Sequence, residues 1–149
     1  MFRMLLAISM ALMSVQALSR ERQSPIGFVV DLTEEFNAGD MEEYVERFAY
    51  PHSRVVNSRF VVVTDPEVSS LAYSQAIASG WAYSKINTIE IIEESASFAL
   101  VRVNFSRYDK DDTEMITFNA YYTMGHDGER WQILHLASSG QPPSANRIR

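Results

Sequence analysis

The second half of the chain contains four strand-like runs that are separated only by short polar turns. The runs occupy residues 87–92, 98–108, 115–124 and 130–137. The last turn contains Asp127-Gly128, a pair that is typical of tight β-hairpins. Because such turns are too short to carry the chain across a sheet, neighbouring runs must lie antiparallel. The sequence therefore predicts an antiparallel meander, in which each strand pairs with the next one along the chain.

The run at 98–108 indicates that one side of this sheet is covered. Val101, Val103 and Phe105 alternate with polar residues, and side chains two positions apart lie on the same face of a strand. One face of the sheet is therefore apolar and must be buried. The earlier part of the chain has to supply the cover.

Three helices are predicted before the meander, each from a capping residue followed by apolar residues at helical spacing. They begin at Ser24-Pro25, Asp40 and Asp65-Pro66 and end at Gly39, Pro51 and Gly80. Residues 52–56 and 60–63 form a small hairpin between the last two helices. This order predicts an α+β domain in which three helices pack on one face of a strongly curved sheet, antiparallel or mixed. Such a layered arrangement encloses a conical space that can hold a small molecule.

The composition excludes several classes of function. A chain of 149 residues, 46% of them hydrophobic, suits one domain with a core of its own. The net charge of −6, without any basic stripe, argues against nucleic acid as a partner. The absence of cysteine excludes disulfides, thiol nucleophiles and cysteine-bound metals.

Two groups of residues could suggest a metal, but neither has the required spacing. Four carboxylates gather at Asp109, Asp111, Asp112 and Glu114, yet the glycine and the length of a calcium-binding loop are missing. We interpret this stretch as a solvated hairpin tip. The histidines at 52, 126 and 135 lack the spacing of zinc ligands. No metal and no other cofactor is predicted.

The N-terminus has the order of a signal peptide at residues 1–19. Arg3 precedes an apolar run, and Ala17-Leu18-Ser19 fits a small-x-small cleavage pattern. We therefore expect export to the periplasm or out of the cell. The alternatives are an N-terminal helix of the domain or a start codon placed too early, and both would leave the protein in the cytoplasm. The apolar run is shorter than the ~20 residues that a bilayer requires, so no membrane span is expected in the mature chain.

Two segments at element junctions carry a resemblance to a known family. They are FNAGDMEEY at 36–44 and GERWQI at 128–133. Together with the order of elements, they resemble the nuclear transport factor 2-like (NTF2-like) superfamily, which includes ketosteroid isomerase, the SnoaL-like polyketide cyclases and scytalone dehydratase. The resemblance covers residues 24–138 and leaves 139–149 as a flexible tail. It implies a cone-shaped fold and says little about function, because this fold hosts enzymes and non-catalytic proteins alike.

Within this superfamily, PHSR at 51–54, Gly80-Trp81 and FSRY at 105–108 are most similar to a bacterial branch with no assigned chemistry. The catalytic residues of ketosteroid isomerase do not carry over. Its aspartate base corresponds to Val56, its tyrosine to Leu32 and its protonated aspartic acid to Ala120. Apolar side chains can neither take up a proton nor donate to an enolate oxygen, so isomerisation by that constellation is disfavoured.

Strand alternation and the resemblance nominate other residues for a pocket. Alternation with Trp131 and Ile133 predicts that His135 faces inward, and alternation with Val103 and Phe105 predicts the same for Arg107. Tyr122 belongs to the apolar set of the preceding strand. The resemblance places His52 at the rim of the cone, with Trp81 nearby. The predicted ligand-binding residues are His52, Trp81, Arg107, Tyr122 and His135, and the candidates for acid–base catalysis are His52 and His135.

Each of these residues also has a structural interpretation. His52 can bridge backbone groups at the corner between helix and strand, and Arg107 can pair with an acid such as Asp31. The functional interpretation is that a guanidinium group forks onto a ligand carboxylate while a histidine titrates near neutral pH.

Three functions remain open at this point. The first is a dimeric small-molecule-binding protein of the SnoaL-like type, favouring a small cyclic or acidic ligand. The second is a cofactor-free lyase, isomerase or cyclase that uses histidine acid–base chemistry. The third is a non-catalytic interaction module, which a cone filled by Phe98, Phe118 and Trp131 would favour. The expected homodimer interface is the second face of the sheet, which carries Met115, Thr117, Asn119, Tyr121 and Thr123.

Overall fold

The computed structural model describes residues 22–56 and 58–139. The helices in these ranges are α1 (Pro25–Ala38), α2 (Met41–Glu46) and α3 (Pro66–Ala78). The strands are β1 (Phe48–Val56), β2 (Arg59–Val63), β3 (Trp81–Glu94), β4 (Phe98–Asp109), β5 (Glu114–His126) and β6 (Trp131–Ser138). The predicted signal peptide and the tail from residue 140 onward lie outside the described residues.

The three predicted helices are present and begin at the predicted caps. The Ser24 hydroxyl accepts a hydrogen bond from the backbone of Gly27, and the Asp65 carboxylate accepts one from the backbone of Glu67. At the end of α1, Gly39 has a φ of +74°, a left-handed conformation that a glycine adopts without strain. No helix within the described ranges is long and apolar enough to cross a membrane.

Two element boundaries differ from the prediction. The sequence predicts that the second helix continues to Pro51, but α2 ends at Glu46 and β1 begins at Phe48. Phe48 pairs with Ile133 of β6 and is only 1% exposed, so burial in the sheet outweighs the helical spacing. The strand predicted from residue 87 begins at Trp81, because register shifts in the β3–β4 ladder interrupt the alternation that a sequence pattern can detect.

The strands form one mixed sheet in the order β2-β1-β6-β5-β4-β3. The predicted meander is confirmed, since β3 to β6 pair antiparallel with their neighbours along the chain. The predicted hairpin of β1 and β2 is also antiparallel, but β1 joins β6 in parallel. The parallel junction brings β1 beside the C-terminal strand of the domain, so both line the same space.

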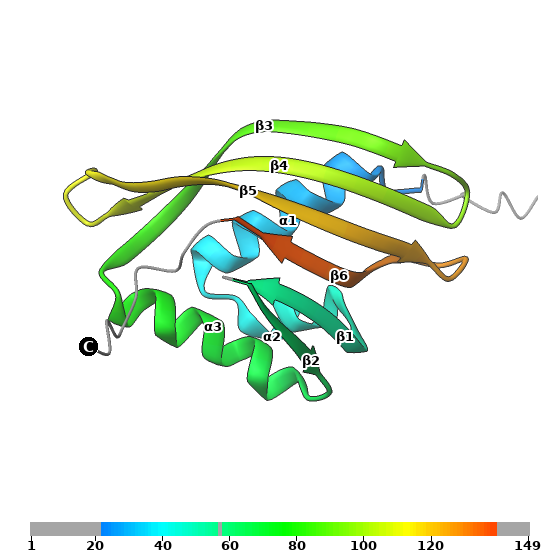
Figure 1. The fold of residues 1–149 in the computed structure, drawn as a ribbon, viewed down its shortest axis with the longest axis horizontal. Helices are drawn as coiled ribbons and strands as arrows, with labels where there is room; N and C mark the ends of the chain where they lie inside the picture. The colour runs from blue at the N-terminus through cyan, green and yellow to red at the C-terminus, as the bar shows by residue number, and fades with distance from the viewer. Residues whose placement is uncertain (1–21, 57, 140–149) are drawn as a thin grey trace, which may run out of the picture.

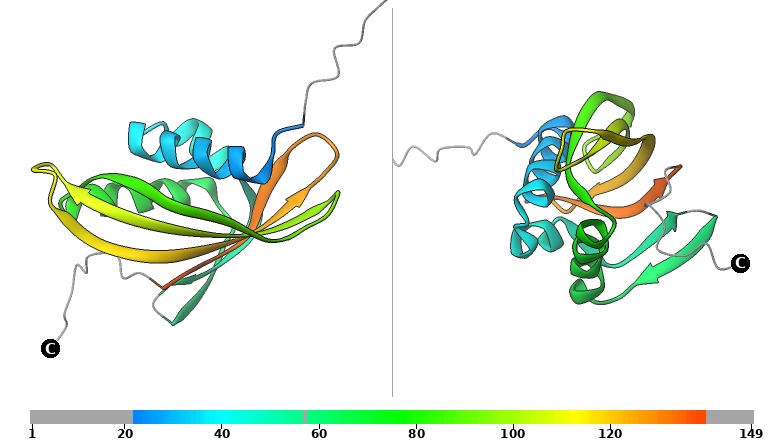
Figure 2. Two further views of the ribbon diagram at one scale, coloured as in Figure 1. Left: turned by 90° about the horizontal axis from the view of Figure 1, so that it is seen from above. Right: turned by 90° about the vertical axis from the view of Figure 1, so that its left-hand side faces the viewer.

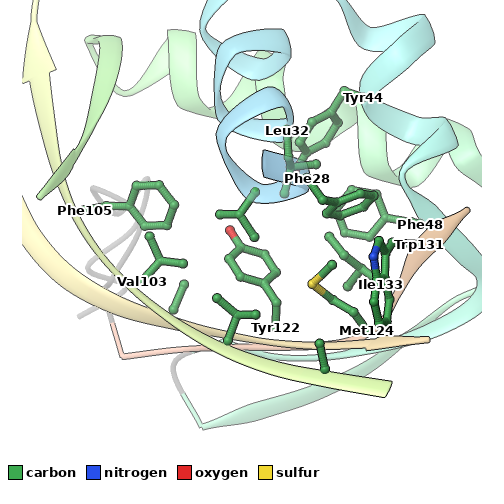
Figure 3. Close-up of a cluster of buried hydrophobic side chains, with 14 residues drawn as sticks. Phe28, Leu32, Tyr44, Phe48, Val103, Phe105, Tyr122, Met124, Trp131 and Ile133 are labelled. Atoms are coloured by element: carbon green, nitrogen blue, oxygen red, sulfur yellow. The ribbon is translucent and has the colours of Figure 1, made fainter. Parts of the chain in front are cut away.

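The helices cover the concave face of this curved sheet (Figure 1). Seen from above and from the end, the long strands bend beneath α1 while α3 lies beside it (Figure 2). The core occupies the layer between α1 and the sheet. Its largest fully buried apolar side chains include Phe28, Phe48, Met124 and Ile133, several of which appear together in Figure 3. The α+β architecture predicted from the sequence is therefore confirmed.

Candidate functional site

A cavity of about 320 Å³ lies between the helices and the sheet, beyond the packed core. All three helices contribute to its wall, as do strands β1, β3, β4, β5 and β6. Its volume is at the lower end of the range for small-molecule sites. The sequence leaves open whether aromatic side chains fill the cone. In the structure, Phe118 lines the cavity but does not fill it. An interaction module with a solid core is therefore disfavoured.

Two arginines and two tyrosines give the cavity its chemical character. They are Arg54, Arg107, Tyr44 and Tyr122. Smaller polar groups come from Thr33, Gln75, Ser84 and Ser138, and the remaining wall is apolar. No lining residue in the described part of the chain is acidic. The cavity therefore carries positive charge without an internal counter-charge.

Arg107 reaches the cavity from the second half of β4. Its Nε is buried and has no hydrogen-bond partner among residues 22–56 and 58–139. Its guanidinium carbon lies 5.1 Å from the centre of the Phe118 ring, a cation–π contact. Burial lowers the pKa of Arg107, although the neighbouring Tyr122 and Tyr44 phenols act in the opposite direction. A guanidinium group with unused donors in an apolar wall is arranged to receive an anion.

The structural interpretation of Arg107, an ion pair with Asp31, does not hold. The Asp31 carboxylate lies 3.8 Å from Nη2 of Arg47 instead. Arg47 also donates from Nε to both carboxylate oxygens of Glu35, at 3.1 and 3.0 Å. Asp31 and Glu35 are thus paired with Arg47, and neither is among the residues that line the cavity.

Arg54 enters the cavity from β1 and is held in place by neutral groups. Its Nε donates to Nε2 of His52 at 2.9 Å, and its Nη2 donates to the Ser69 hydroxyl at 3.0 Å. The guanidinium carbon also lies 4.9 Å from the centre of the Phe48 ring. The group is therefore oriented from three sides while its charge remains uncompensated.

His52 supports Arg54 and is not among the residues that line the cavity. The imidazole is 2% exposed, and its Nδ1 lies 2.9 Å from the Ala49 carbonyl oxygen. Because Nε2 accepts from Arg54, Nδ1 must carry the proton and donate to this carbonyl. Burial and the Arg54 charge lower the pKa of His52, and the bond to Ala49 only partly opposes them. His52 is thus a neutral positioning residue, as its structural interpretation anticipates.

The two phenols line the same cavity as the two cationic groups. Figure 3 shows the Tyr122 ring rising from the sheet with its hydroxyl directed toward the helices, while Tyr44 approaches from α2. Burial raises the pKa of Tyr122 and of Tyr44, and the charges of both Arg54 and Arg107 lower each of them in part. Both phenols are therefore protonated near neutral pH and can donate a hydrogen bond.

Comparisons with known proteins find the same fold, a curved sheet covered by helices. The family model described as NTF2-like protein (DUF6841) matches residues 27–141. The chain belongs to this NTF2-like family. A comparison with curated proteins found no match.

Solved structures share the fold of this NTF2-like protein. An NTF2-like protein of unknown function from Shewanella oneidensis is 22% identical, with 78% of this chain and 100% of that one covered and a TM-score of 0.61. An NTF2-like protein with a cystatin-like fold from Novosphingobium aromaticivorans is 11% identical over 79% of this chain and 80% of its own, with a TM-score of 0.62. A ketosteroid isomerase-like protein from Erwinia carotovora is 13% identical over 76% and 90%, with a TM-score of 0.56. At these identities the likeness extends to the fold alone.

The three positions that correspond to the isomerase's catalytic residues all line the cavity of this NTF2-like protein. They are Leu32, Val56 and Ala120. The predicted correspondence thus falls on the cavity wall, where the apolar side chains of this chain provide no acid–base group. The polar groups of the cavity are the two arginines, the two tyrosines and the four smaller residues named above.

His135 does not lie where strand alternation predicts. It pairs with Thr123, whereas Ile133 pairs with Met124, so Leu134 is an extra residue in β6 and forms a bulge. The bulge turns His135 to the outer face, where its Nδ1 lies 2.7 Å from the Ser53 hydroxyl. Leu136 and Ser138 line the cavity instead.

Trp81 lies behind the cavity wall and not in it. The indole is 2% exposed, and its Nε1 donates to the hydroxyl of Ser84, a lining residue. The Asn37 side chain fixes the backbone of Ser84 through a pair of 2.8 Å hydrogen bonds. Of the five predicted ligand-binding residues, the structure thus brings Arg107 and Tyr122 together in the cavity. The ligand-binding role of all five stays a prediction.

Sequence reasoning missed Arg54 and Tyr44. Arg54 lies two positions after His52 and so shares its face of β1, a signal that was present in the sequence. Tyr44 lies on the apolar side of α2, where its pattern is that of an ordinary core residue. Within residues 22–56 and 58–139, no group of three or more potential ligands is arranged to hold a metal ion.

Proposed function

We propose that this protein binds a small organic anion in the cavity and that its preferred ligand class is a planar or cyclic carboxylic acid. One observation carries the proposal: Arg107 presents a guanidinium group with a buried, unpartnered Nε to a cavity whose described lining includes no acid. An unpaired buried charge is costly to a fold. Binding a carboxylate would offset this cost and satisfy the unused donors.

The rest of the lining supports a ring-containing acid. Phe118 stacks under the Arg107 guanidinium group, and its ring centre lies 5.7 Å from that of Phe105. These rings offer apolar surface beside the cationic group. The Tyr122 hydroxyl, kept protonated by its raised pKa, can add a hydrogen bond to the carboxylate.

Binding without turnover is the reading that the side chains favour. A general base must be free to accept a proton at working pH. His52 uses both ring nitrogens within the protein, and burial raises the pKa of both Tyr44 and Tyr122. The guanidinium groups of Arg54 and Arg107 carry hydrogen-bond donors and no acceptor, so the described lining lacks a ready base.

The experiment is a titration with benzoate and its neutral counterpart benzamide, followed by two-dimensional NMR so that weak binding is also measured. Arg107→Ala should weaken benzoate binding by about 1.5–3 kcal/mol, or roughly ten- to a hundredfold. Benzamide should lose much less. Arg102→Ala is the matched control, because it removes the same charge from an exposed residue that pairs with Glu90 outside the cavity.

The proposal fails if Arg107→Ala and the wild type bind benzoate equally, or if Arg102→Ala weakens binding as much as Arg107→Ala does. It also fails if the wild type does not distinguish benzoate from benzamide. Thermal unfolding of each variant shows whether the fold is retained.

Export and self-association belong to the same proposal. A binding protein with a cleaved signal peptide would act in the periplasm or outside the cell, and a mature N-terminus at Arg20 in the native host would support this.

Dimerisation through the outer face of the sheet would use Tyr121, which is 37% exposed. Sedimentation of the wild type and of Tyr121→Lys tests it, since a lysine there would bury an unpaired charge in the interface.

A further inference from the structure

We infer that Arg54 forms a second anion-binding position in the same cavity, so that the preferred ligand carries two carboxylates held apart by a short apolar spacer. This inference rests on the proposed function, in which Arg107 receives the first carboxylate. It assigns a distinct role to Arg54 and narrows the ligand class from carboxylic acids to dicarboxylic acids.

The two guanidinium groups enter the cavity from different sides. Arg54 lies on β1 and Arg107 on β4, and these strands are separated in the sheet by β6 and β5. Three steps between neighbouring strands span roughly 14 Å in a flat sheet. The residues are also displaced along the strands, since Arg54 is level with Leu136 and Tyr122 while Arg107 is level with Ile116. Six positions of β5, from 116 to 122, correspond to roughly 20 Å.

The curved sheet and the long side chains bring the charged ends nearer to each other than the backbones are. Both guanidinium groups lower the pKa of Tyr122 and of Tyr44, which places the two phenols within the field of both charges. The two cationic groups thus border the same pair of phenols and come from different strands, β1 and β4. This arrangement suits a ligand with an anionic group at each end more than a single compact anion.

Contacts within the protein already orient the Arg54 side chain for this role. His52 and Ser69 hold its Nε and Nη2, and Phe48 packs against its face. Its Nη1 keeps no partner within the described ranges. A side chain that is already ordered loses less conformational entropy when it binds, so its hydrogen bonds contribute more to affinity.

Neither cation has a counter-charge in the described structure. The ion pairs found there involve Arg47, Arg102, Lys110 and Arg130, and not Arg54 or Arg107. Two uncompensated like charges that share one cavity of low polarity repel each other. A monoanion removes half of this imbalance, whereas a dianion removes it entirely.

The size of the cavity limits the spacer. At about 30 Å³ of liquid volume per water molecule, 320 Å³ corresponds to roughly ten waters. A benzene ring with two carboxylates is of this order, and its flat faces match the Phe105 and Phe118 rings.

The experiment compares benzoate with phthalate, isophthalate and terephthalate, which add a second carboxylate at three fixed separations. In the wild type, the tightest of the three should bind at least about tenfold more tightly than benzoate, the lower limit for one additional charge-assisted hydrogen bond. Arg54→Met should remove this advantage, so that the best diacid binds this variant no more tightly than benzoate does. Arg107→Ala should weaken benzoate and the diacids alike, and Arg102→Ala is again the control.

A graded variant tests whether Arg54 must be oriented as well as charged. Ser69→Ala keeps the guanidinium group but removes the Nη2 partner, so it should lose part of the advantage of the diacid. Arg54→Lys keeps the charge but loses the planar guanidinium group that can donate two parallel hydrogen bonds. This variant replaces Arg54→Met if Arg54→Met does not fold. Thermal unfolding identifies such a failure.

Several results would overturn the inference. If benzoate binding depends on Arg107 but no diacid binds more tightly than benzoate, the second position does not exist, although the proposed function stands. If the advantage of the diacid persists in Arg54→Met, another group provides it. If inorganic phosphate binds as tightly as the best diacid and requires both arginines, the two groups converge on one anion. If the wild type binds neither benzoate nor any diacid, the proposed function fails together with the inference.

Discussion

The space between the helices and the sheet has a packed half and a hollow half. In the packed half, Phe28, Phe48 and Ile133 are at most 1% exposed and belong to one cluster of buried hydrophobic side chains. In the hollow half, the same sheet face continues through Arg107, and β6 contributes Leu136 to a space of about 320 Å³. The strands run through both halves, so the sheet alone does not explain the difference.

The residues that face the sheet from the helices explain it better. The packed half receives large side chains, with Phe28 from α1 directed at the sheet as Figure 3 shows. Over the hollow half, α3 presents Ala72 and Ala76. Short side chains on one helix leave room that the charged and aromatic groups of the sheet do not fill. The tightly packed core and the proposed binding site thus lie at different ends of one layer.

The largest expected effect comes from truncating a side chain in each half of the same strand. Ile133→Ala in the packed half should lower the free energy of unfolding by about 2–5 kcal/mol, because a new cavity forms where packing is tight. Leu136→Ala should cost less than about 2 kcal/mol, since its side chain already borders empty space. Urea denaturation measures both. Equal losses would mean that the two halves do not differ in packing.

Two arginines should respond in opposite directions when replaced by methionine. Arg47→Met should destabilise the protein by about 1.5–3 kcal/mol, because the half-buried Glu35 carboxylate loses its partner. Arg107→Met should raise stability by about 0.5–2 kcal/mol, as is common when a functional residue is replaced by one that suits the fold. This sign agrees with the lowered pKa of Arg107 and the raised pKa of Arg47. Destabilisation in both variants would show that Arg107 is a structural residue.

The smallest expected effect is the pH dependence of stability that comes from His52, the residue that accepts a hydrogen bond from Arg54. Because the pKa of His52 is lowered in the folded state, the unfolded chain binds its proton first as the pH falls below about 6.5. The contribution of His52 to the free energy of unfolding should therefore be fully present above that pH and decline below it. It should level off once the pH is below the folded-state pKa. His52→Gln should show a shallower decline between pH 7.5 and pH 5 when unfolding is followed in urea. An identical slope in both proteins would exclude His52 as its source.

Most of the fold could be predicted because its signals are local. Caps at Ser24 and Asp65, the stop at Gly39 and the alternation in β4 each depend on a few neighbouring residues. The end of α2 could not be predicted, since Phe48 follows a helical pattern and is drawn into β1 by its partner Ile133. Contacts between distant segments decided that boundary.

The site was predictable only where alternation is unbroken. Arg107 and Tyr122 follow the regular pattern of β4 and β5 and line the cavity. His135 lies beyond a bulge whose extra residue no simple alternation reveals. The importance of Arg54 depends on Ser69 in α3, fifteen positions away, and on a histidine whose role is to hold it.

The bulge in β6 shifts the alternation of inward and outward side chains by one residue. Were this strand regular, His135 and Ala137 would face the cavity, and Leu136 and Ser138 would face outward. Gly125 on the neighbouring strand leaves room for the extra residue, because a side chain there would come within 2.9 Å of Leu134. One inserted position thus determines whether an imidazole or an aliphatic group faces the cavity. Two chains with the same fold and a similar composition can therefore present different side chains to that space through register alone.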